Sequence, residues 1–402
     1  MKDIRMTLTP RERVLTSLHH QAPDRIPMDF LATMEIWDRL IAHLNLDTIG
    51  ISDNDYYEAG REALLRHFEV DCRLLSYDMF CAPPESLIKS GSQVSWWISM
   101  NRSTPNRMWR QVNPDATMHD IWSTHSYKME TAVGAYEGFK TWPLAEAQTV
   151  DELKSHPWPS PDWWDFSPLQ GLMQRLDAHQ PYHIRFRLGS VFEIGWQLRG
   201  LQEFMLDLIE NSAIPVYIME RLTEIYLENL RRVLEADAAA GGRLDMVYFY
   251  DDVATQNSLM VSKKMWNQFV RPYHAKIIEL AHKFNKPVMY HTDGSVYQII
   301  PEFIEMGVDL LNPLQPDAKD MDLQKIKDEF GDKICFHGGV DIMRTLPKGN
   351  PAKVQAEVKD RVKVLGRNGG YILCSSHHIQ PDTPIENVIA MYDPKLRYMA
   401  EQ

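Results

Sequence analysis

Short apolar runs that end on polar residues recur along this chain, and stretches of helical periodicity lie between them. The runs predict eight strands, with starts near residues 26, 74, 183, 246, 288, 310, 334 and 371. The run that starts at Val288 shows the pattern most clearly, because it stops on His291 and Asp293, two side chains that can bind metal. Polar groups placed repeatedly at the ends of buried strands indicate that the strands build a site.

The helices between these runs carry recognisable end signals. Residues 9–12 read Thr-Pro-Arg-Glu, which predicts a capping box with proline in the first turn. Asn350 and Pro351 predict the start of a later helix. Its apolar stripe is formed by Val354, Val358, Val362 and Leu365.

Eight strands that alternate with helices predict an α/β fold, most simply a (β/α)8 TIM barrel that spans residues 1–402 as one domain. A doubly wound sheet is the main competitor. Neither GxGxxG nor GxxxxGK[ST] follows any predicted strand, so the nucleotide-binding versions of that competitor lose support.

Residues 81 to about 180 interrupt the alternation and are expected to form an insertion. Residues 95–100 and 108–112 within it predict strands. Aromatic side chains can fill a small core or line a binding mouth, and both interpretations stay open here. The segment holds eight of the eleven tryptophans, namely Trp96, Trp97, Trp109, Trp122, Trp142, Trp158, Trp163 and Trp164.

Composition narrows the class of protein. The net charge of −12 argues against binding to a nucleic-acid backbone, which needs clustered Lys and Arg. There is no run of 18 apolar residues and no recognisable signal peptide, so we expect a soluble, cytoplasmic protein. The cysteines lack CxxC spacing and are expected to be buried, with Cys374 a possible exception near the site; they are Cys72, Cys81, Cys335 and Cys374.

Closing a barrel would bring the polar strand ends to one mouth, where barrel enzymes have their active sites. His291 and Asp293 are two residues apart and lie on the same side of an extended chain, so one metal ion could bind both. Imidazole and carboxylate suit zinc, and His377 could be the third ligand. Without a metal, the same groups would act as general acid and base or would bind a carboxylate.

The other strand-end groups receive roles from their chemistry. We predict catalytic roles for His291, His337 and Asp252, and substrate binding by Asp251, Arg187, Asp78 and Gln315. Two of these assignments have structural alternatives. One carboxylate of the Asp251–Asp252 pair could only cap the following helix, and Arg187 could pair with a buried aspartate. His378 is expected to point away from its neighbour.

Several of these segments resemble the uroporphyrinogen decarboxylase superfamily, over nearly the whole chain. They include His291-Thr292-Asp293-Gly294 and His337-Gly338-Gly339-Val340-Asp341. The remaining matches are residues 9–14, 23–27, 251–256, 376–382 and 384–387. The resemblance implies the barrel fold. True uroporphyrinogen decarboxylases hold the substrate carboxylates with an arginine-rich segment, and the corresponding residues 28–35 contain no arginine, so that reaction is not expected.

The other chemistry of the superfamily is methyl transfer to or from a corrinoid protein. The resemblance places the zinc ligands of those methyltransferases, His-x-Cys and a later Cys, at His291, Asp293 and His377. Replacing both thiolates makes the metal harder and favours an oxygen-bound substrate such as a methyl ether. The chain lacks an Asp-x-His-x-x-Gly motif, so a corrinoid would come from a separate partner protein.

Two other functions remain open from the sequence. One is a metal-free decarboxylase or lyase that acts on a small carboxylic acid, held by Arg187 and the histidines. The other is a non-catalytic corrinoid-binding or scaffold protein that keeps the barrel but has lost its chemistry. The sequence does not indicate the oligomeric state.

Overall fold

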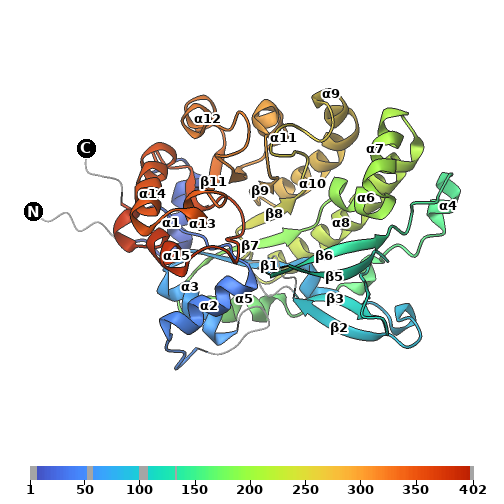
Figure 1. Cartoon of the computed structure of the whole chain (residues 1–402), viewed down its shortest axis with the longest axis horizontal. Coiled ribbons are helices and arrows are strands. Elements are labelled where there is room, and N and C mark those ends of the chain that lie inside the picture. Colours follow the sequence, from blue (N-terminus) through green and yellow to red (C-terminus); the bar gives the residue numbers. More distant parts are fainter. Residues whose placement is uncertain (1–6, 52–57, 99–106, 132–133, 399–402) are drawn as a thin grey trace, which may run out of the picture.

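The computed structural model describes residues 7–51, 58–98, 107–131 and 134–398, and its centre is a curled parallel sheet of seven strands (Figure 1). In order across the sheet these are β1 (Cys72–Ser76), β7 (His183–Leu188), β8 (Met246–Tyr250), β9 (Val288–His291), β10 (Leu310–Leu314), β11 (Cys335–Val340) and β12 (Tyr371–Ser375). Nearly every residue of these strands is buried, as in a parallel sheet covered by helices.

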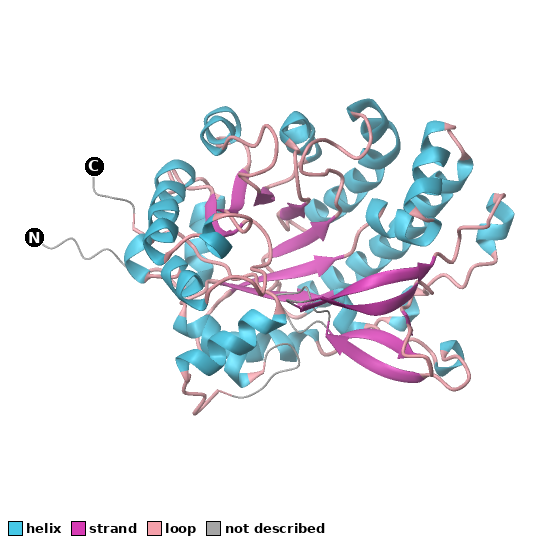
Figure 2. Cartoon of the chain, viewed as in Figure 1, coloured by secondary structure: helices cyan, strands magenta, loops and turns pink. Residues whose placement is uncertain are grey.

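Helices, drawn in cyan in Figure 2, surround the parallel sheet. They are α1 (Pro10–Leu18), α2 (Met34–Leu44), α3 (Ala59–His67), α4 (Val150–Lys154), α5 (Leu169–Asp177), α6 (Phe192–Arg199), α7 (Leu201–Ile209), α8 (Ala213–Ala239), α9 (Lys263–Met265), α10 (Arg271–Lys283), α11 (Ile300–Met306), α12 (Leu323–Phe330), α13 (Thr345–Lys348), α14 (Pro351–Leu365) and α15 (Ile385–Met391). Across the described residues, none is both long and apolar enough to cross a membrane.

The segment around Met28 takes the position between β12 and β1. Asp29 N donates to Leu373 O at 3.0 Å, and Asp71 N, just before β1, donates to Met28 O at 2.9 Å. The chain was predicted to form a full strand over residues 26–30, but only an isolated bridge between Met28 and Leu373 forms. Pro27 has no N–H, and Met28 N donates to the Asp71 carboxylate at 2.7 Å, so no regular ladder to β1 develops. The result is a TIM-like barrel with seven regular strands.

Buried arginines and carboxylates fix this closing segment. Arg13 on α1 lies 2.7 Å from Asp24 and 2.6 Å from Asp71, and Arg25 lies 2.8 Å from Asp71. A buried carboxylate with two charged partners and a backbone donor has its hydrogen-bonding capacity met. The N-terminal motif therefore serves the fold.

Helix α1 closes the amino end of the barrel. Its Ser17 side chain accepts from Tyr371 N and donates to Tyr371 O, at the first residue of β12. Its Val14 packs into a small buried cluster with side chains of the strands, namely Cys72, Met246, Met289, Leu310, Cys335 and Ile372. With this end covered, the polar strand ends at the opposite end remain available for a site.

A second, antiparallel sheet of five strands lies between β1 and β7 in sequence, and at the lower right of Figure 1. Its strands are β2 (Gln93–Ile98), β3 (Arg107–Val112), β4 (Met118–His119), β5 (His125–Thr131) and β6 (Gly134–Thr141). The two strands predicted within this part of the chain are confirmed as β2 and β3, with part of the first prediction, residues 99–100, outside the described residues. That residues 81–180 are an insertion, and that residues 1–402 form one domain, stay predictions.

The helix-end predictions hold in detail. Thr9 and Glu12 form the capping box of α1, and Asn350 accepts from Lys353 N at the start of α14. The predicted apolar stripe of α14 is its buried face: Val354, Val358, Val362 and Leu365. These features depend on local spacing, which the sequence contains.

Candidate functional site

The carboxyl ends of the strands face the antiparallel sheet across a cavity of about 440 Å³. From the barrel side it is lined by Tyr77, Asp78, Cys81, Arg187, Glu193, Ile194, Trp196, Gln197, Tyr248, Tyr250, Asp252, His291, His377 and His378. From the segment that carries the antiparallel sheet it is lined by Trp109, Arg110, Asp120, Ile121, Trp122, Glu137 and Phe139. Pockets of this size that hold small molecules are typically mostly apolar with a few placed polar groups.

Three predicted residues meet beside this cavity, and two of them, His291 and His377, line it. His377 Nε2 lies 3.2 Å from Asp293 Oδ2, and His291 Nε2 lies 4.0 Å from Asp293 Oδ1. The candidate ligand atoms of the three residues all lie within 4.8 Å of one another. Ligand atoms bound ~2.0–2.1 Å from a tetrahedral zinc ion are about 3.3 Å apart, so small side-chain shifts would let all three bind one ion. The residues present therefore fit zinc, with room for a substrate atom.

The charges of this group are interdependent. Burial alone would raise the pKa of Asp293, but His377 and then His291 outweigh it and lower the pKa to about 2. The same carboxylate raises the pKa of His377 in spite of that histidine's burial. Asp252, whose Oδ1 lies 3.9 Å from His291 Nε2, has a pKa raised to about 6 by burial and by the charge of Asp293. A cation between these groups would relieve the excess of negative charge.

Asp251 was predicted to bind substrate, but the structure gives it a different role. Its side chain is fully buried, and its oxygens accept from the backbone N–H groups of Val191, Phe192 and Glu193 at 2.7–2.8 Å. His274 Nε2 lies 2.8 Å from Asp251 Oδ2. Asp251 therefore caps the start of α6 and does not line the cavity.

His337 and Gln315 also occupy positions other than those predicted. His337 is fully buried, and its two ring nitrogens lie against Asp29 and Asn312 at 2.9 and 2.5 Å, so it does not reach the cavity. Gln315 Nε2 donates to Asp293 Oδ1 at 3.1 Å, and Gln315 Oε1 accepts from Gly294 N at 2.7 Å. Both side chains support the cavity residues from behind.

Arg187 pairs with a carboxylate at the cavity wall. Its NH2 group lies 2.6 Å from Asp78 Oδ2 and 3.1 Å from Ser76 Oγ, and its guanidinium lies over the Tyr250 ring at 5.4 Å. Both predicted residues line the cavity, but the charge of Arg187 is balanced within the protein. Of the two interpretations left open by the sequence, the pairing with a buried aspartate is the one observed.

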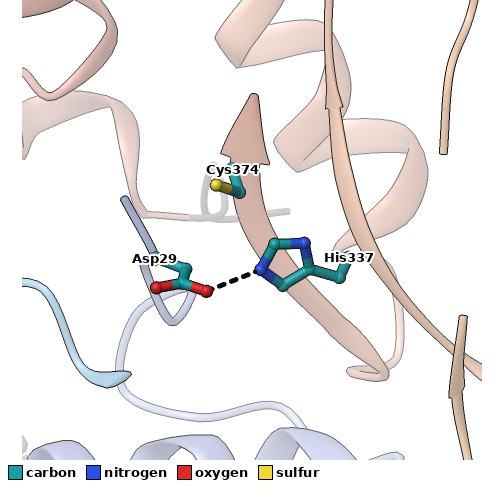
Figure 3. Close-up of side chains that lie close together, drawn as sticks. All are labelled: Asp29, His337 and Cys374. Atoms are coloured by element: carbon teal, nitrogen blue, oxygen red, sulfur yellow. Dashed lines mark hydrogen bonds and ion pairs between the residues drawn. The ribbon is translucent and has the colours of Figure 1, made fainter. Parts of the chain in front are cut away.

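A second group of possible ligands, Asp29, His337 and Cys374, lies deeper in the barrel (Figure 3). Asp29 pairs with Arg185, and His337 Nε2 lies 2.9 Å from Asp29 Oδ2. Burial raises the pKa of the Cys374 thiol well above its ordinary value. Asp29 and His337 are engaged with each other, and Cys374 Sγ lies 3.8 Å from Ser375 Oγ, so the group supports the structure beneath the cavity.

Some residues that line the cavity were not predicted from the sequence. His378 lines the cavity beside His377, with ring centroids 4.8 Å apart, because both follow the end of β12 where strand alternation no longer holds. Arg110, Asp120 and Glu137 come from the antiparallel sheet and its loops, where no strand-end rule indicates them. All four cysteines are buried and free, which confirms the prediction for Cys72, Cys81 and Cys335 and shows that Cys374, the possible exception, is buried as well.

The tryptophans divide between the two expected roles. Trp109 and Trp122 line the cavity while also being buried, and Trp164 is buried against Tyr77. Trp142 is 40% exposed. Both interpretations of the tryptophan-rich segment, core filling and a wall of the cavity, therefore apply to different residues.

The pH dependence of stability provides a test of the cavity's charge. Burial raises the pKa of Asp120 to about 6, above its ordinary value of 3.8, in spite of Arg110. The charged form therefore destabilises the folded protein above pH 6, and this destabilisation disappears as the pH falls from 6 towards 4. We expect Asp120→Asn to raise the free energy of unfolding by about 2 kcal/mol at pH 7.5, and by less at pH 5.

Urea denaturation of both proteins at the two pH values measures this difference. Asp115→Asn, in the turn between β3 and β4, is the control. Hydrogen bonds from Thr117 lower the pKa of Asp115 to about 2, so its replacement should give no gain. A loss of stability in Asp120→Asn at pH 7.5 would contradict the expectation.

The fold and site describe a TIM-like α/β barrel with a polar site at the carboxyl ends of its strands. The family model of uroporphyrinogen decarboxylase (URO-D) matches residues 188–394, which is half of the chain, so the protein belongs to the uroporphyrinogen decarboxylase family. The match covers β8 to β12 and the cluster of His291, Asp293 and His377.

Curated relatives are similar over shorter stretches. Uroporphyrinogen decarboxylase from Chlorobium phaeobacteroides is 22% identical over 177 residues, 42% of this chain and 45% of that protein. Uroporphyrinogen decarboxylase from Coxiella burnetii is 31% identical over 72 residues, 18% of this chain and 19% of that protein. The chain thus matches less than half the length of each of these relatives.

A solved structure is similar over almost the whole chain. It is a methyltransferase from Methanosarcina mazei, with a TM-score of 0.60 and 18% sequence identity. The similarity covers 96% of this chain and 97% of that one. At this identity the comparison concerns the fold.

Proposed function

We propose that this protein is a methyltransferase that moves a methyl group between a small substrate and the cobalt of a corrinoid bound to a separate partner protein. The observation that carries the proposal is the convergence of His291, Asp293 and His377, two of which line the cavity, His291 and His377. Their nitrogen and oxygen atoms suit zinc. The similarity in fold to a methyltransferase supports the same reaction class.

The charges of the cavity oppose the main alternative, a metal-free decarboxylase. The described lining of the cavity includes five carboxylates, Asp78, Asp120, Glu137, Glu193 and Asp252, but only two arginines, Arg110 and Arg187. Arg187 lies 2.6 Å from Asp78, and Arg110 lies 3.5 Å from Glu137. An anionic substrate would therefore meet an excess of negative charge, whereas a neutral methyl ether would not.

Each protein group then has a role in transfer from a methyl ether. Zinc, when bound, would supply Lewis acidity towards the ether oxygen. His291, Asp293 and His377 would hold the ion, and Asp252, at the cavity wall next to His291, would deliver a proton to the departing oxygen. The methyl carbon leaves the ether oxygen and bonds to Co(I), which supplies the electron pair. The aromatic walls would exclude water from this step.

Metal analysis tests the site. We expect about one equivalent of zinc in the wild-type protein after reconstitution, and its loss in His377→Ala. His378→Ala is a matched control, because His378 also lines the cavity but is not among the three candidate ligands. It should retain zinc. Absence of zinc from the reconstituted wild-type protein would overturn the metal site.

Methyl transfer needs its own assay. We expect methylcobalamin to form, seen by its absorption spectrum, when the protein is mixed with Co(I) cobalamin and a methyl ether donor. His291→Ala should reduce the rate at least 100-fold. No product from a broad panel of methyl donors, with zinc bound, would contradict methyl transfer while leaving the metal site in place.

The cytoplasmic location and the corrinoid partner stay predictions.

A further inference from the structure

A buried amide links the cavity to the interior of the barrel. Asn312, from β10, is fully buried between two histidines on the neighbouring strands β9 and β11. Its Oδ1 lies 2.5 Å from His291 Nδ1, and its Nδ2 lies 2.5 Å from His337 Nδ1. Asn312 and His291 are partners in the parallel ladder, which places their side chains next to each other.

His291, Asn312, His337 and Asp29 form a row of hydrogen bonds. The direction in which these bonds donate is set at the inner end, by Asp29. His337 Nε2 lies 2.9 Å from Asp29 Oδ2, and Arg185 also pairs with that oxygen. Burial would raise the pKa of Asp29, but Arg185 and His337 hold it well below its ordinary value, so Asp29 is a charged acceptor. Burial lowers the pKa of His337, which favours the neutral ring. A neutral His337 must therefore carry its proton on Nε2 and donate it to Asp29.

The remaining protons follow from this assignment. His337 Nδ1 is then an acceptor, and Asn312 Nδ2 donates to it. That leaves Asn312 Oδ1 as an acceptor facing His291 Nδ1, which must carry a proton. Rotating the amide by 180° would place its acceptor against the lone pair of His337 Nδ1 and its donor against the protonated nitrogen of His291. Only one orientation satisfies all four groups.

We propose that Asn312 is a positioning residue that fixes a proton of the His291 ring on Nδ1 and leaves Nε2, the nitrogen that faces Asp252 and Asp293, as the atom that binds a cation. The distances of 3.9 and 4.0 Å from Nε2 to these carboxylates exceed a hydrogen bond, so neither carboxylate holds this nitrogen. A histidine whose other nitrogen is held in this way is prepared to bind a cation. The consequence for metal binding rests on the proposed function, but the assignment of the proton does not.

Nitrogen-15 spectra of ring-labelled histidine test the assignment directly, in protein treated with a chelator. We expect His291, identified by the signal that disappears in His291→Ala, to carry its proton on Nδ1 at every pH at which the ring holds a single proton. The reverse assignment in the wild-type protein would overturn the proposal. This readout needs neither metal nor substrate, so its failure is distinct from failure of the methyltransferase assay.

Two substitutions separate positioning from packing. Asn312→Asp keeps an acceptor for His291 Nδ1–H, and one proton taken up between its second oxygen and His337 Nδ1 replaces the lost N–H donor. His291 should therefore stay in the Nδ1–H form, and zinc affinity should remain within about threefold of wild type. Asn312→Leu removes the acceptor and should lower zinc affinity 10- to 100-fold, measured by competition with a chelating dye. Asn387→Leu is the control, because Asn387 is an equally buried asparagine whose side chain donates to Leu346 O. It should leave zinc affinity and the His291 signals unchanged.

The outcomes decide between the two roles. If Asn312→Leu keeps the His291 proton on Nδ1, Asn312 does not determine it and the proposal is wrong. If Asn312→Leu does not fold, Asn312→Asp still decides: a change of the His291 signal to the Nε2–H form in that variant would contradict the proposed acceptor role.

Discussion

Replacing Asp251 with alanine is expected to lower the free energy of unfolding by about 3–5 kcal/mol. The buried Asp251 carboxylate accepts from three backbone N–H groups at the start of α6 and contacts His274 at 2.8 Å. Its removal leaves those donors inside the protein without an acceptor, and leaves His274 without its carboxylate partner. Urea denaturation measures the loss.

The neighbouring carboxylate is the natural control for this prediction. Asp252 lines the cavity, and 37% of its side chain is exposed. We expect Asp252→Ala to change the free energy of unfolding by less than about 1 kcal/mol and to reduce methyl transfer instead. If Asp251→Ala kept full stability but lost turnover, the substrate-binding role first assigned to Asp251 would be restored.

Arg185→Met is expected to lower the free energy of unfolding by a similar amount, about 3–5 kcal/mol, because it leaves the Asp29 charge buried without its main partner. Both side chains are almost inaccessible, at 3% and 7% exposure. Arg221→Met is the control, since Arg221 pairs with Glu224 at the surface of α8 and should contribute under ~1 kcal/mol. Denaturation of the three proteins under identical conditions measures both effects.

The pH dependence has a defined sign. The folded-state pKa of Asp29 lies below its ordinary value, so its contribution to stability is present above the unfolded pKa and is lost as the pH falls through the folded one. In Arg185→Met the pKa of Asp29 should rise, so the difference from wild type should be largest near neutral pH and should shrink in acid. A difference that stays constant with pH would show that the cost arises from lost packing of the Arg185 side chain.

The zinc proposal depends on three residues that the sequence indicated. His291 and Asp293 were found from strand periodicity, since they follow an apolar run at a spacing of two residues. His377 was found in the same way after β12. Convergence of all three at the cavity is what the structure adds.

For two adjacent carboxylates, the sequence does not determine which one faces the cavity. Asp251 and Asp252 both follow β8, and neighbouring residues of an extended chain point to opposite sides. The sequence could not say which of them faces the cavity, because that depends on the position of α6. The structure turns Asp251 towards the N-terminus of α6 and Asp252 towards the cavity.

The sequence by itself determined the features that depend on local spacing: the strand runs, the capped ends of α1 and α14, and the ligand-like residues at strand ends. Only the tertiary structure decided which of those polar groups reach the cavity. It buried His337 behind Asn312, paired Arg187 with Asp78, and brought Arg110, Asp120 and Glu137 to the cavity from the second sheet. The reason is physical: hydrogen-bond partners and burial depend on residues far apart in sequence, and local periodicity carries no information about which of them meet.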